Sequence, residues 1–576
     1  MTVDKPNPDT SRDDSAGPHV SNAILTRYGL FVVYTFLMTL PVLAALVISH
    51  VGGPYSWDDG AITLAFGQTL FATGEFALNA SSPRVEGSSS LLFAILSGGV
   101  VQGLALDFNE AVISSRVISA IFLGATSCLL FHILRRYLSV PHAALISALY
   151  CLLPVHYAEV FNGMEMTAFA FFLLVYFHFL NKRHLVALVV LPCVLLIRIE
   201  AGFYLLVVLA LAIWKAQPLD RARFLQHFGA TVLMLLALQL FRTLYFDSFV
   251  PNTILAKMHP PYSASGLRGI ELKFLGLMDF LKHYAVPVIT IPVLFFLTGP
   301  KRRVRPEHLL IIAFGLFAIL SGRNWGYDAR MTLSLLAPAI VGVAAASDAL
   351  AEKGKSATLS LLPAALILLT IAGHSVGSIG SVRQFLSALA TGASYSEFSE
   401  MDVSNLDPTQ PYSHGFYGVT PDNYRITGEA VEAMAERLDL PVIKFVVPDV
   451  GGLGLCCDTV AVIDIALLTN PVLAKQGYAG FDEYLSKVAP DLIQTHEVWS
   501  LVTGMYDSRY FQENFTPIIF RNNFMYLRND HAETLLSRGD ATRTSFRAFD
   551  FGTVRYGADV SNGLYSITES SLLQVR

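Results

Sequence analysis

Long apolar runs separated by short polar loops fill the first two thirds of the chain. Twelve of these runs reach or approach the roughly 20 residues that a helix needs to cross a bilayer. They are Tyr28–His50, Ser88–Leu106, Val112–Leu134, His142–Val160, Met166–Leu180, Leu185–Ile197, Ala201–Trp214, Phe224–Tyr245, Tyr284–Leu297, Leu309–Ser321, Thr332–Ala346 and Thr358–Val376. The pattern predicts a mainly α, polytopic membrane protein.

Composition agrees with this prediction. The 576 residues are 53% hydrophobic and 15% charged, whereas soluble globular proteins are about 25% charged. The small net charge of -5 argues against a nucleic acid partner. Residues 1–27 are polar, and we expect a disordered cytoplasmic tail there. No cleavage site follows the first apolar run, so this run is expected to be an anchor.

The basic residues set the topology, because Lys and Arg accumulate in cytoplasmic loops. If all basic clusters face the cytoplasm, the run Ser88–Leu106 does not cross the membrane. Three crossings before Arg135–Arg136 would place that cluster outside. Gly98, Gly99 and Gly103 interrupt this run, and we expect an interfacial helix there. The other eleven runs then cross. The clusters are Lys5 with Arg12 and Arg27, Arg135–Arg136, Lys182–Arg183, Lys215 with Arg221 and Arg223, Lys301–Arg305, and Lys353 with Lys355.

This topology divides the chain into a transmembrane domain, residues 28–376, and an extracytoplasmic domain, residues 377–576. The first outer loop covers residues 51–110. In the second domain, short apolar runs alternate with helical patterns, which predicts a small soluble α/β domain. The expected strands are Pro441–Pro448 and Val460–Ile465, and the expected helices are Thr427–Leu438 and Phe481–Val488. The expected location is the inner (plasma) membrane, with several crossings.

The first outer loop holds two adjacent acids, Asp58 and Asp59, a few residues after the first membrane span. Adjacent carboxylates repel each other, so at least one should have a shifted pKa or a cationic partner. Charged groups at a membrane edge are costly and commonly functional. The alternative is that Asp58 only caps the following helix.

The predicted topology gathers further polar residues at the same outer face. Arg198 and Glu200 are two residues apart and would point to different faces of a helix, so each is expected to find its own partner. Lys257 and Arg330 could instead reach to the interface as ordinary flanking cations. For the outer glutamates, the alternative is pairing with Arg84, Arg198 or Arg323. These glutamates are Glu86, Glu165 and Glu200.

Several kinds of site are not indicated. The chain has no Walker loop, paired glycine-rich dinucleotide turn or HExxH motif, so nothing suggests ATP, and no cofactor is expected. No compact Asp/His cluster lies on the outer side, and we expect no metal. We interpret Gly451–Gly454 as a turn after a strand. The five cysteines show no zinc spacing and no expected disulfide framework, because a bridge between the neighbours Cys456 and Cys457 would be strained.

A set of short strings nevertheless resembles one family. Trp57-Asp58-Asp59-Gly60 followed by Asn79 and Arg84-Val85-Glu86-Gly87 resembles the first outer loop of membrane-embedded GT-C glycosyltransferases. Further matching strings are Gly163-Met164-Glu165, Arg198-Ile199-Glu200-Ala201, Val250-Pro251-Asn252-Thr253 with Lys257, Gly322-Arg323-Asn324-Trp325 with Arg330, and Asp449-Val450-Gly451-Gly452-Leu453-Gly454 with Val462-Ile463-Asp464.

Within these enzymes, the chain is most similar to the mycobacterial terminal arabinofuranosyltransferase family and its uncharacterised bacterial relatives. The strings cover nearly the whole chain. The chain departs from the family pattern at Ala201, where the family often has Gly.

The resemblance implies transfer of a sugar, such as a pentofuranose, from a polyprenyl phosphate donor to a glycan or other acceptor at the outer membrane face. Asp59 or Asp58 would be the general base that takes the proton of the acceptor hydroxyl. Lys257, Arg323 and Arg330 would hold the departing phosphate. Glu86, Glu165 and Glu200 would orient sugar hydroxyls or these cations. Arg84, Arg198, Asn252 and Trp325 complete the expected substrate site.

Two other classes of function fit a polytopic chain with charges in it. A transporter or flippase would place its charges near the bilayer midplane and commonly shows internal repeats. Here the charges lie at one face, and no repeat is evident. A non-catalytic assembly factor could share the fold without the activity, and the retained acid pair argues against it.

Overall fold

The computed structural model describes residues 17–52, 58–180, 182–215, 217–260, 262–263, 266–298, 305–322, 332–351, 361–380, 382–383, 386, 420–495, 497–521 and 523–543. The predicted site residues Trp57, Arg323, Trp325 and Arg330 lie outside these ranges.

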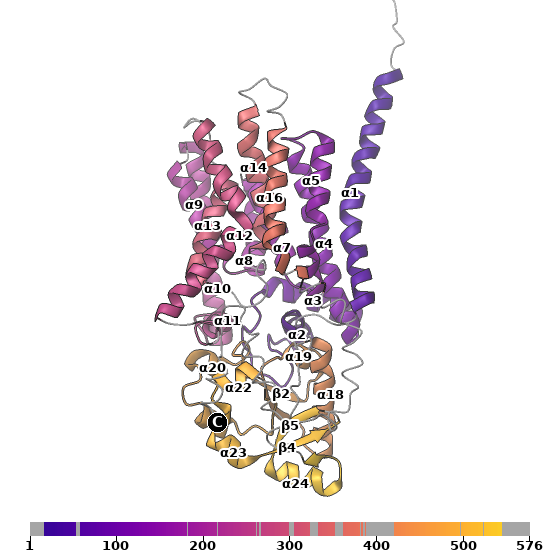
Figure 1. Ribbon diagram of the computed structural model, residues 1–576, viewed down its shortest axis with the longest axis vertical. Helices are drawn as coiled ribbons and strands as arrows, with labels where there is room; N and C mark the ends of the chain where they lie inside the picture. Colours follow the sequence, from indigo (N-terminus) through magenta and orange to yellow (C-terminus); the bar gives the residue numbers. More distant parts are fainter. Residues whose placement is uncertain are drawn as a thin grey trace, which may run out of the picture.

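The apolar part of the chain folds into a bundle of helices (Figure 1). Its elements are α1 (Gly17–Gly52), α2 (Asp58–Thr73), α3 (Leu91–Leu104), α4 (Phe108–Leu134), α5 (Val140–Cys151), α6 (Pro154–Phe161), α7 (Met166–Leu180), α8 (His184–Ile197), α9 (Ala201–Lys215), α10 (Pro218–Phe246), α11 (Asn252–Ala256), α12 (Gly266–Thr298), α13 (Pro306–Ser321), η1 (Leu333–Leu335), α14 (Leu336–Ala351) and α16 (Leu362–Gly377).

Four of the described helices are long and apolar enough to cross a membrane: Tyr28–Val51, Phe108–Leu134, Asp220–Phe246 and Gly266–Leu297. The bent pair α5 and α6 would make a fifth. The sequence predicts one span there, but Pro154 starts a new helix, bent by 43° from the first. The other six predicted crossings correspond to apolar helices of 10–17 residues. The prediction of a polytopic, mainly helical protein is therefore confirmed, while eleven crossings stay a prediction.

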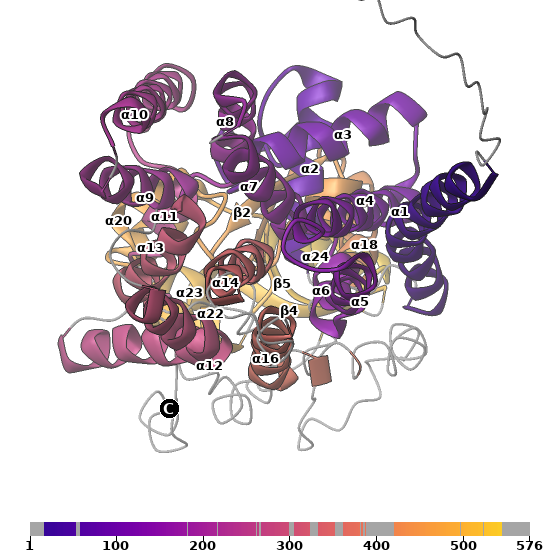
Figure 2. The same cartoon turned by 90° about the horizontal axis from the view of Figure 1, so that it is seen from above.

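Helices α2 and α3 lie across the bundle rather than along it. Figure 2, which looks along the long axis, shows both lengthwise while most bundle helices are seen close to end-on. They cross each other closely at Gly67 and Gly98, which have no side chain to keep the helices apart. A Cβ at either position would overlap the backbone of the other helix. Helix α3 forms within the run Ser88–Leu106, and its assignment as an interfacial helix stays a prediction.

The C-terminal domain, here residues 420–543, lies beyond one end of the bundle (Figure 1). It contains one six-stranded sheet with the order β2-β1-β3-β5-β4-β6. Strands β2, β1 and β3 are parallel, and β5, β4 and β6 add to them as antiparallel neighbours. The strands are β1 (Ile443–Val447), β2 (Val460–Asp464), β3 (Leu492–Ile493), β4 (Phe515–Phe520), β5 (Asn523–Arg528) and β6 (Thr542–Arg543).

Helices surround this sheet, as the alternating pattern predicts. The predicted helix Phe481–Val488 and both predicted strands are confirmed, and the helix predicted at Thr427–Leu438 starts earlier, at Pro421. The helices are α18 (Pro421–Arg437), α19 (Gly451–Cys456), α20 (Pro471–Gln476), α21 (Phe481–Val488), α22 (Glu497–Val502), η4 (Met505–Asp507), α23 (Arg509–Asn514) and α24 (Asn529–Arg538).

Two expectations for this domain are wrong. Gly451–Gly454 belongs to the short helix α19 and is not a simple turn. Cys456 and Cys457, expected to be unpaired, form a disulfide. Both sulfurs pack against Gly428 of α18, where a side chain would collide with them. The three remaining cysteines are free.

The hydrophobic core of the C-terminal domain is shared with the outer loops of the membrane part. One cluster joins Phe66 and Leu78 of the first outer loop to Val431 and Leu453. A second cluster joins Ala256 of α11 to residues of β1 and β2. Burial of apolar surface therefore fixes the domain against the loops that hold the predicted site residues.

Candidate functional site

Asp58 is the first residue of α2 and is 3% exposed. Its Oδ2 accepts a hydrogen bond from the backbone N–H of Gly451 at 2.5 Å, and its Oδ1 accepts one from Gly452 at 2.8 Å. The partners of this carboxylate thus come from α19 of the C-terminal domain, not from the first turn of α2. The alternative that Asp58 only caps its own helix is not what the structure shows.

Burial raises the pKa of Asp58 to about 8. The negative charge of Asp449 adds to the effect, that of Asp59 adds less, and the two amide hydrogen bonds oppose it. The sequence predicts a perturbed pKa for one member of the acid pair, and this is confirmed. Repulsion within the pair is the smallest of these causes, so the perturbation comes mainly from burial.

Asp59 is half-buried, and its charge acts on Asp58 and Tyr262. The phenol of Tyr262 is a common neighbour: burial and the charges of Asp464, Asp59 and Asp449 raise its pKa. Burial also raises the pKa of Asp464 to about 7, with Asp449 adding to it. Asp58, Asp59, Asp449, Asp464 and Tyr262 are thus linked by the effects of their charges on one another, and this acidic cluster between α2 and the C-terminal domain is called the acidic pocket below.

A chain of polar contacts links this pocket to a buried arginine. Thr63, one helical turn beyond Asp59, lies 3.2 Å from Ser88, hydroxyl to hydroxyl. The neighbouring Ser89 accepts a hydrogen bond from Arg198 at 3.0 Å. Gly60, three residues before Thr63 in α2, packs so closely on Asn162 that a Cβ would overlap the Asn162 backbone oxygen. The segments around Asp58, Ser88, Asn162 and Arg198, which are far apart in the sequence, thus lie next to one another in the structure.

Arg198 forms ion pairs with two glutamates, Glu165 at 2.5 Å and Glu200. Arg198 has the expected partner from elsewhere in Glu165, but the prediction that Glu200 would not pair with Arg198 is wrong. It assumed a helix, but α8 ends at Ile197 and Arg198 has an extended backbone, which lets the two side chains meet. Burial would raise the pKa of Glu200, yet Arg198 and, more weakly, Lys257 hold it below its ordinary value.

Glu86 pairs with an arginine that the sequence does not single out. Arg242 of α10 donates two hydrogen bonds to its carboxylate, at 2.6 and 2.8 Å, and both residues are buried. The signal available in the sequence is a lone Arg near the outer end of the predicted span Phe224–Tyr245. Arg84, the expected alternative partner, is exposed and stacks over the ring of Tyr245, 5.4 Å from its centroid.

Two asparagines of the outer loops bind the C-terminal domain. The side-chain amide of Asn252 donates to the carbonyl oxygens of Leu467 and Leu468 at 2.9 and 2.8 Å. The amide of Asn79 donates to those of Cys457 and Val460, both at 2.8 Å. The structure therefore gives Asn252, predicted as a substrate residue, a docking contact.

Lys257 follows α11 directly and is exposed. Its charge acts on Glu200, as the lowered pKa of that residue shows. Lys257 is therefore an exposed cation whose charge reaches the Arg198–Glu200 ion pair. In the described part of the chain, no group of three or more His, Cys, Asp or Glu side chains is arranged to hold a metal ion.

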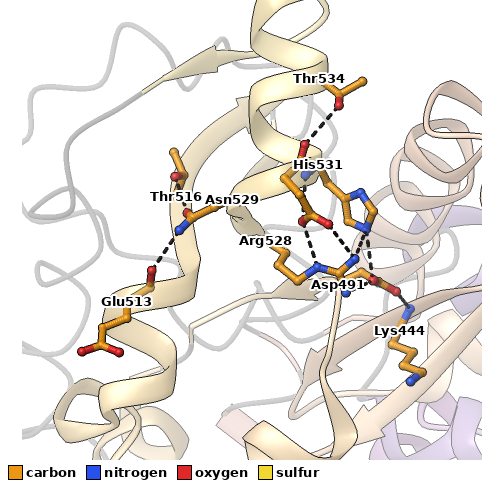
Figure 3. Close-up of polar contacts among 9 residues, drawn as sticks. Lys444, Asp491, Glu513, Thr516, Arg528, Asn529, His531 and Thr534 are labelled. Atoms are coloured by element: carbon orange, nitrogen blue, oxygen red, sulfur yellow. Dashed lines mark hydrogen bonds and ion pairs between the residues drawn. The ribbon is translucent and has the colours of Figure 1, made fainter.

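A second polar cluster lies at the end of the C-terminal domain that is remote from the bundle (Figures 1 and 3). Asp491 accepts from the guanidinium of Arg528 at 2.7 Å and from the backbone N–H of Lys444 at 2.9 Å. His531 Nε2 lies 3.2 Å from the same carboxylate. This distal cluster ties the ends of β1, β3 and β5 together.

No protein-family model and no curated protein sequence matches the chain. Among solved structures, the fold is similar to ArnT from Cupriavidus metallidurans bound to undecaprenyl phosphate, with a TM-score of 0.41 and 13% identity over 66% of this chain and 83% of that one. It is also similar to the Archaeoglobus fulgidus oligosaccharyltransferase, both tethered with an acceptor peptide (TM-score 0.44, 12% identity, 86% of this chain and 74% of that one) and in the apo form (0.43, 12%, 92% and 78%).

Proposed function

We propose that the chain is a membrane-embedded glycosyltransferase of the GT-C type. It transfers a sugar, such as a pentofuranose, from a polyprenyl phosphate to a hydroxyl group of a glycan acceptor at the extracytoplasmic membrane face. The observation that carries the proposal is the position of the half-buried acid Asp59 one helical turn before Thr63. The contact of Thr63 with Ser88 leads through Ser89 to Arg198, which pairs with Glu200, and Lys257 acts on Glu200 through its charge.

Asp59 is the general base of this proposal. A base must come within hydrogen-bond reach of the acceptor hydroxyl. Asp59 is partly exposed, whereas Asp58 is buried and both of its oxygens already accept backbone hydrogen bonds.

Lys257 is the described cation that would receive the phosphate leaving group, because it is exposed at the membrane edge. Positive charge placed at the departing phosphate stabilises the negative charge that develops there. Arg198 is engaged by Glu165 and Glu200 and would act by holding Glu200 in place. Arg323 and Arg330 stay proposed partners of the phosphate, and Trp325 of the sugar.

The test uses full-length protein in membranes with a radiolabelled pentofuranosyl polyprenyl phosphate and a synthetic pentofuranoside oligosaccharide. Replacement Asp59→Asn is expected to lower the transfer rate by about 10²–10⁴-fold, the usual contribution of a general base. Glu75→Gln, an exposed acid of the same loop, is the matched control and should keep the parental rate.

Parental rates in Asp59→Asn would overturn the role of this residue. Movement of the labelled lipid across liposome membranes without any transfer would favour a flippase instead. Neither transfer nor movement, with the protein folded, would favour an assembly factor.

A further inference from the structure

The two adjacent acids, Asp58 and Asp59, have different surroundings, which indicates that they have different roles. Asp58 is 3% exposed and uses both oxygens on Gly451 and Gly452, while Asp59 beside it is half-buried. A carboxylate offers an acceptor on each oxygen, whereas an asparagine amide offers only one acceptor atom. Two N–H donors that point at one side chain therefore require an acid at position 58.

The segment 449–452 fits against its neighbours only with glycine at the contact points. A Cβ at Gly451 would overlap the backbone oxygen of Asp58, and a Cβ at Gly452 would overlap that of Pro421 in α18. The segment thus lies between the first outer loop on one side and its own domain on the other, and Asp58 supplies the polar contact to it.

This contact determines where Asp449 lies. Asp449 comes two residues before Gly451, and its carboxylate accepts a hydrogen bond from Tyr424 at 3.0 Å. Its charge acts on Asp58, Asp464 and Tyr262, which together with Asp59 make up the rest of the acidic pocket. A shift of the segment would move Asp449 relative to Asp59.

The domain as a whole does not depend on this one contact. Asn79 and Asn252 hold other parts of it, and the shared hydrophobic core buries residues of α2 against α19. Loss of the Asp58 carboxylate should therefore release segment 449–452 locally and leave the domain docked.

We propose that Asp58 is a positioning residue that fixes segment 449–452 and so places Asp449 beside Asp59 to bind the acceptor. The inference rests on the proposed transferase function. In this proposal the C-terminal domain is part of the site that binds the acceptor glycan. The carboxylate of Asp449 receives hydrogen bonds from hydroxyl groups of that glycan. Donor binding lies on the Lys257 side and is independent of Asp58.

The experiment measures two quantities on purified full-length Asp58→Asn, Asp59→Asn and Asp449→Asn proteins. Hydrogen exchange of the peptide that covers residues 449–456 reports on the contact without any need for activity. Transfer kinetics with the substrates named above give separate KM values for donor and acceptor.

Asp58→Asn is expected to speed exchange at Gly451 and Gly452 by about tenfold, because one of the two N–H groups loses its acceptor oxygen. It should raise the acceptor KM by a similar factor and leave the donor KM unchanged. Asp449→Asn should raise the acceptor KM without changing the exchange. Asp59→Asn should lower kcat and leave the exchange as in the parent.

Unchanged exchange in Asp58→Asn would overturn the positioning role. A loss of kcat with an unchanged acceptor KM in this variant would also overturn it, because Asp58 would then act in the chemical step. If the parent transfers no sugar, the proposed function fails, and exchange alone decides whether Asp58 holds the segment. Should Asp58→Asn fail to fold, Gly451→Ala disturbs the same contact from the other side and is measured in the same way.

Discussion

Asp58 and Asp491 are both buried carboxylates that accept backbone hydrogen bonds, 3% and 7% exposed, but their surroundings differ. Asp491 has a guanidinium and an imidazole within hydrogen-bond distance. In the described part of the chain, the hydrogen bonds of Asp58 come from two backbone amides, and its charged neighbours are acids.

The comparison shows what a cationic partner changes. The charges of the distal cluster compensate each other: Arg528 lowers the pKa of Asp530, and that pairing raises the pKa of Arg528. In the acidic pocket, burial and the charge of Asp449 keep protons on Asp58 and Asp464 to higher pH. The distal cluster therefore serves stability, whereas the acidic pocket keeps groups that can exchange protons.

The pH dependence of stability is the most sensitive test of this difference. The pKa values of Asp58 and Asp464 are about 8 and about 7 in the folded protein, above the ordinary 3.8. The folded state then binds protons that the unfolded chain has lost, so the free energy of unfolding should fall as the pH rises from about 4 to about 8. At about 1.36 kcal/mol per pKa unit, the two shifts together correspond to a loss on the order of 10 kcal/mol.

Urea unfolding of the purified protein, followed by tryptophan fluorescence at a series of pH values, measures this loss. Asp58→Asn should flatten part of the curve, and Asp58→Asn with Asp464→Asn most of it. An unchanged curve in the double variant would show that other groups cause the dependence.

Replacement Asp491→Ala should have the next largest effect. It leaves the N–H of Lys444 and the side chains of Arg528 and His531 without their common acceptor. Because the side chains of Arg528 and His531 are partly exposed, we expect a loss of about 2–3 kcal/mol in the free energy of unfolding. Transfer kinetics at a temperature where the protein is folded should stay parental.

Glu533→Ala, an exposed residue of α24, is the matched control and should change the stability little. A loss of transfer in Asp491→Ala, with the domain folded, would contradict the assignment of this cluster to stability.

The smallest effect is expected at the rim of the distal cluster. Asp530 pairs with Arg528 at 2.8 Å, but its side chain is 62% exposed. Asp530→Asn should therefore cost under about 1 kcal/mol. Unfolding at low and high salt checks this, since screening should remove the difference between variant and parent. A larger loss that persists in high salt would show that Asp530 acts through more than its exposed ion pair.

Much of the fold follows from local patterns. Apolar runs of sufficient length become helices, and glycine-interrupted Ser88–Leu106 holds α3, which lies across the bundle. The two predicted strands of the C-terminal domain form, because short β-branched runs between turns favour a buried sheet. The requirement that all basic clusters lie on one side predicts that the polar loop residues share the opposite side. The described members of this set do come together where the bundle meets the C-terminal domain.

Pairings between distant segments could not be predicted in this way. Glu86 finds Arg242, 156 residues away, and Asp58 finds amides almost 400 residues away. Backbone amides carry no sequence signal, so no pattern reveals that they will bind a carboxylate. The Arg198–Glu200 pair escapes prediction because it depends on an extended backbone at a helix end.

The sequence by itself therefore determined which segments enter a membrane and which acids and bases stand at its edge, since hydropathy and charge act residue by residue. Only the tertiary structure decided which of two adjacent aspartates stays accessible. That choice comes from long-range packing, which buries Asp58 under the glycines of α19 and leaves Asp59 at the solvent side of the same contact.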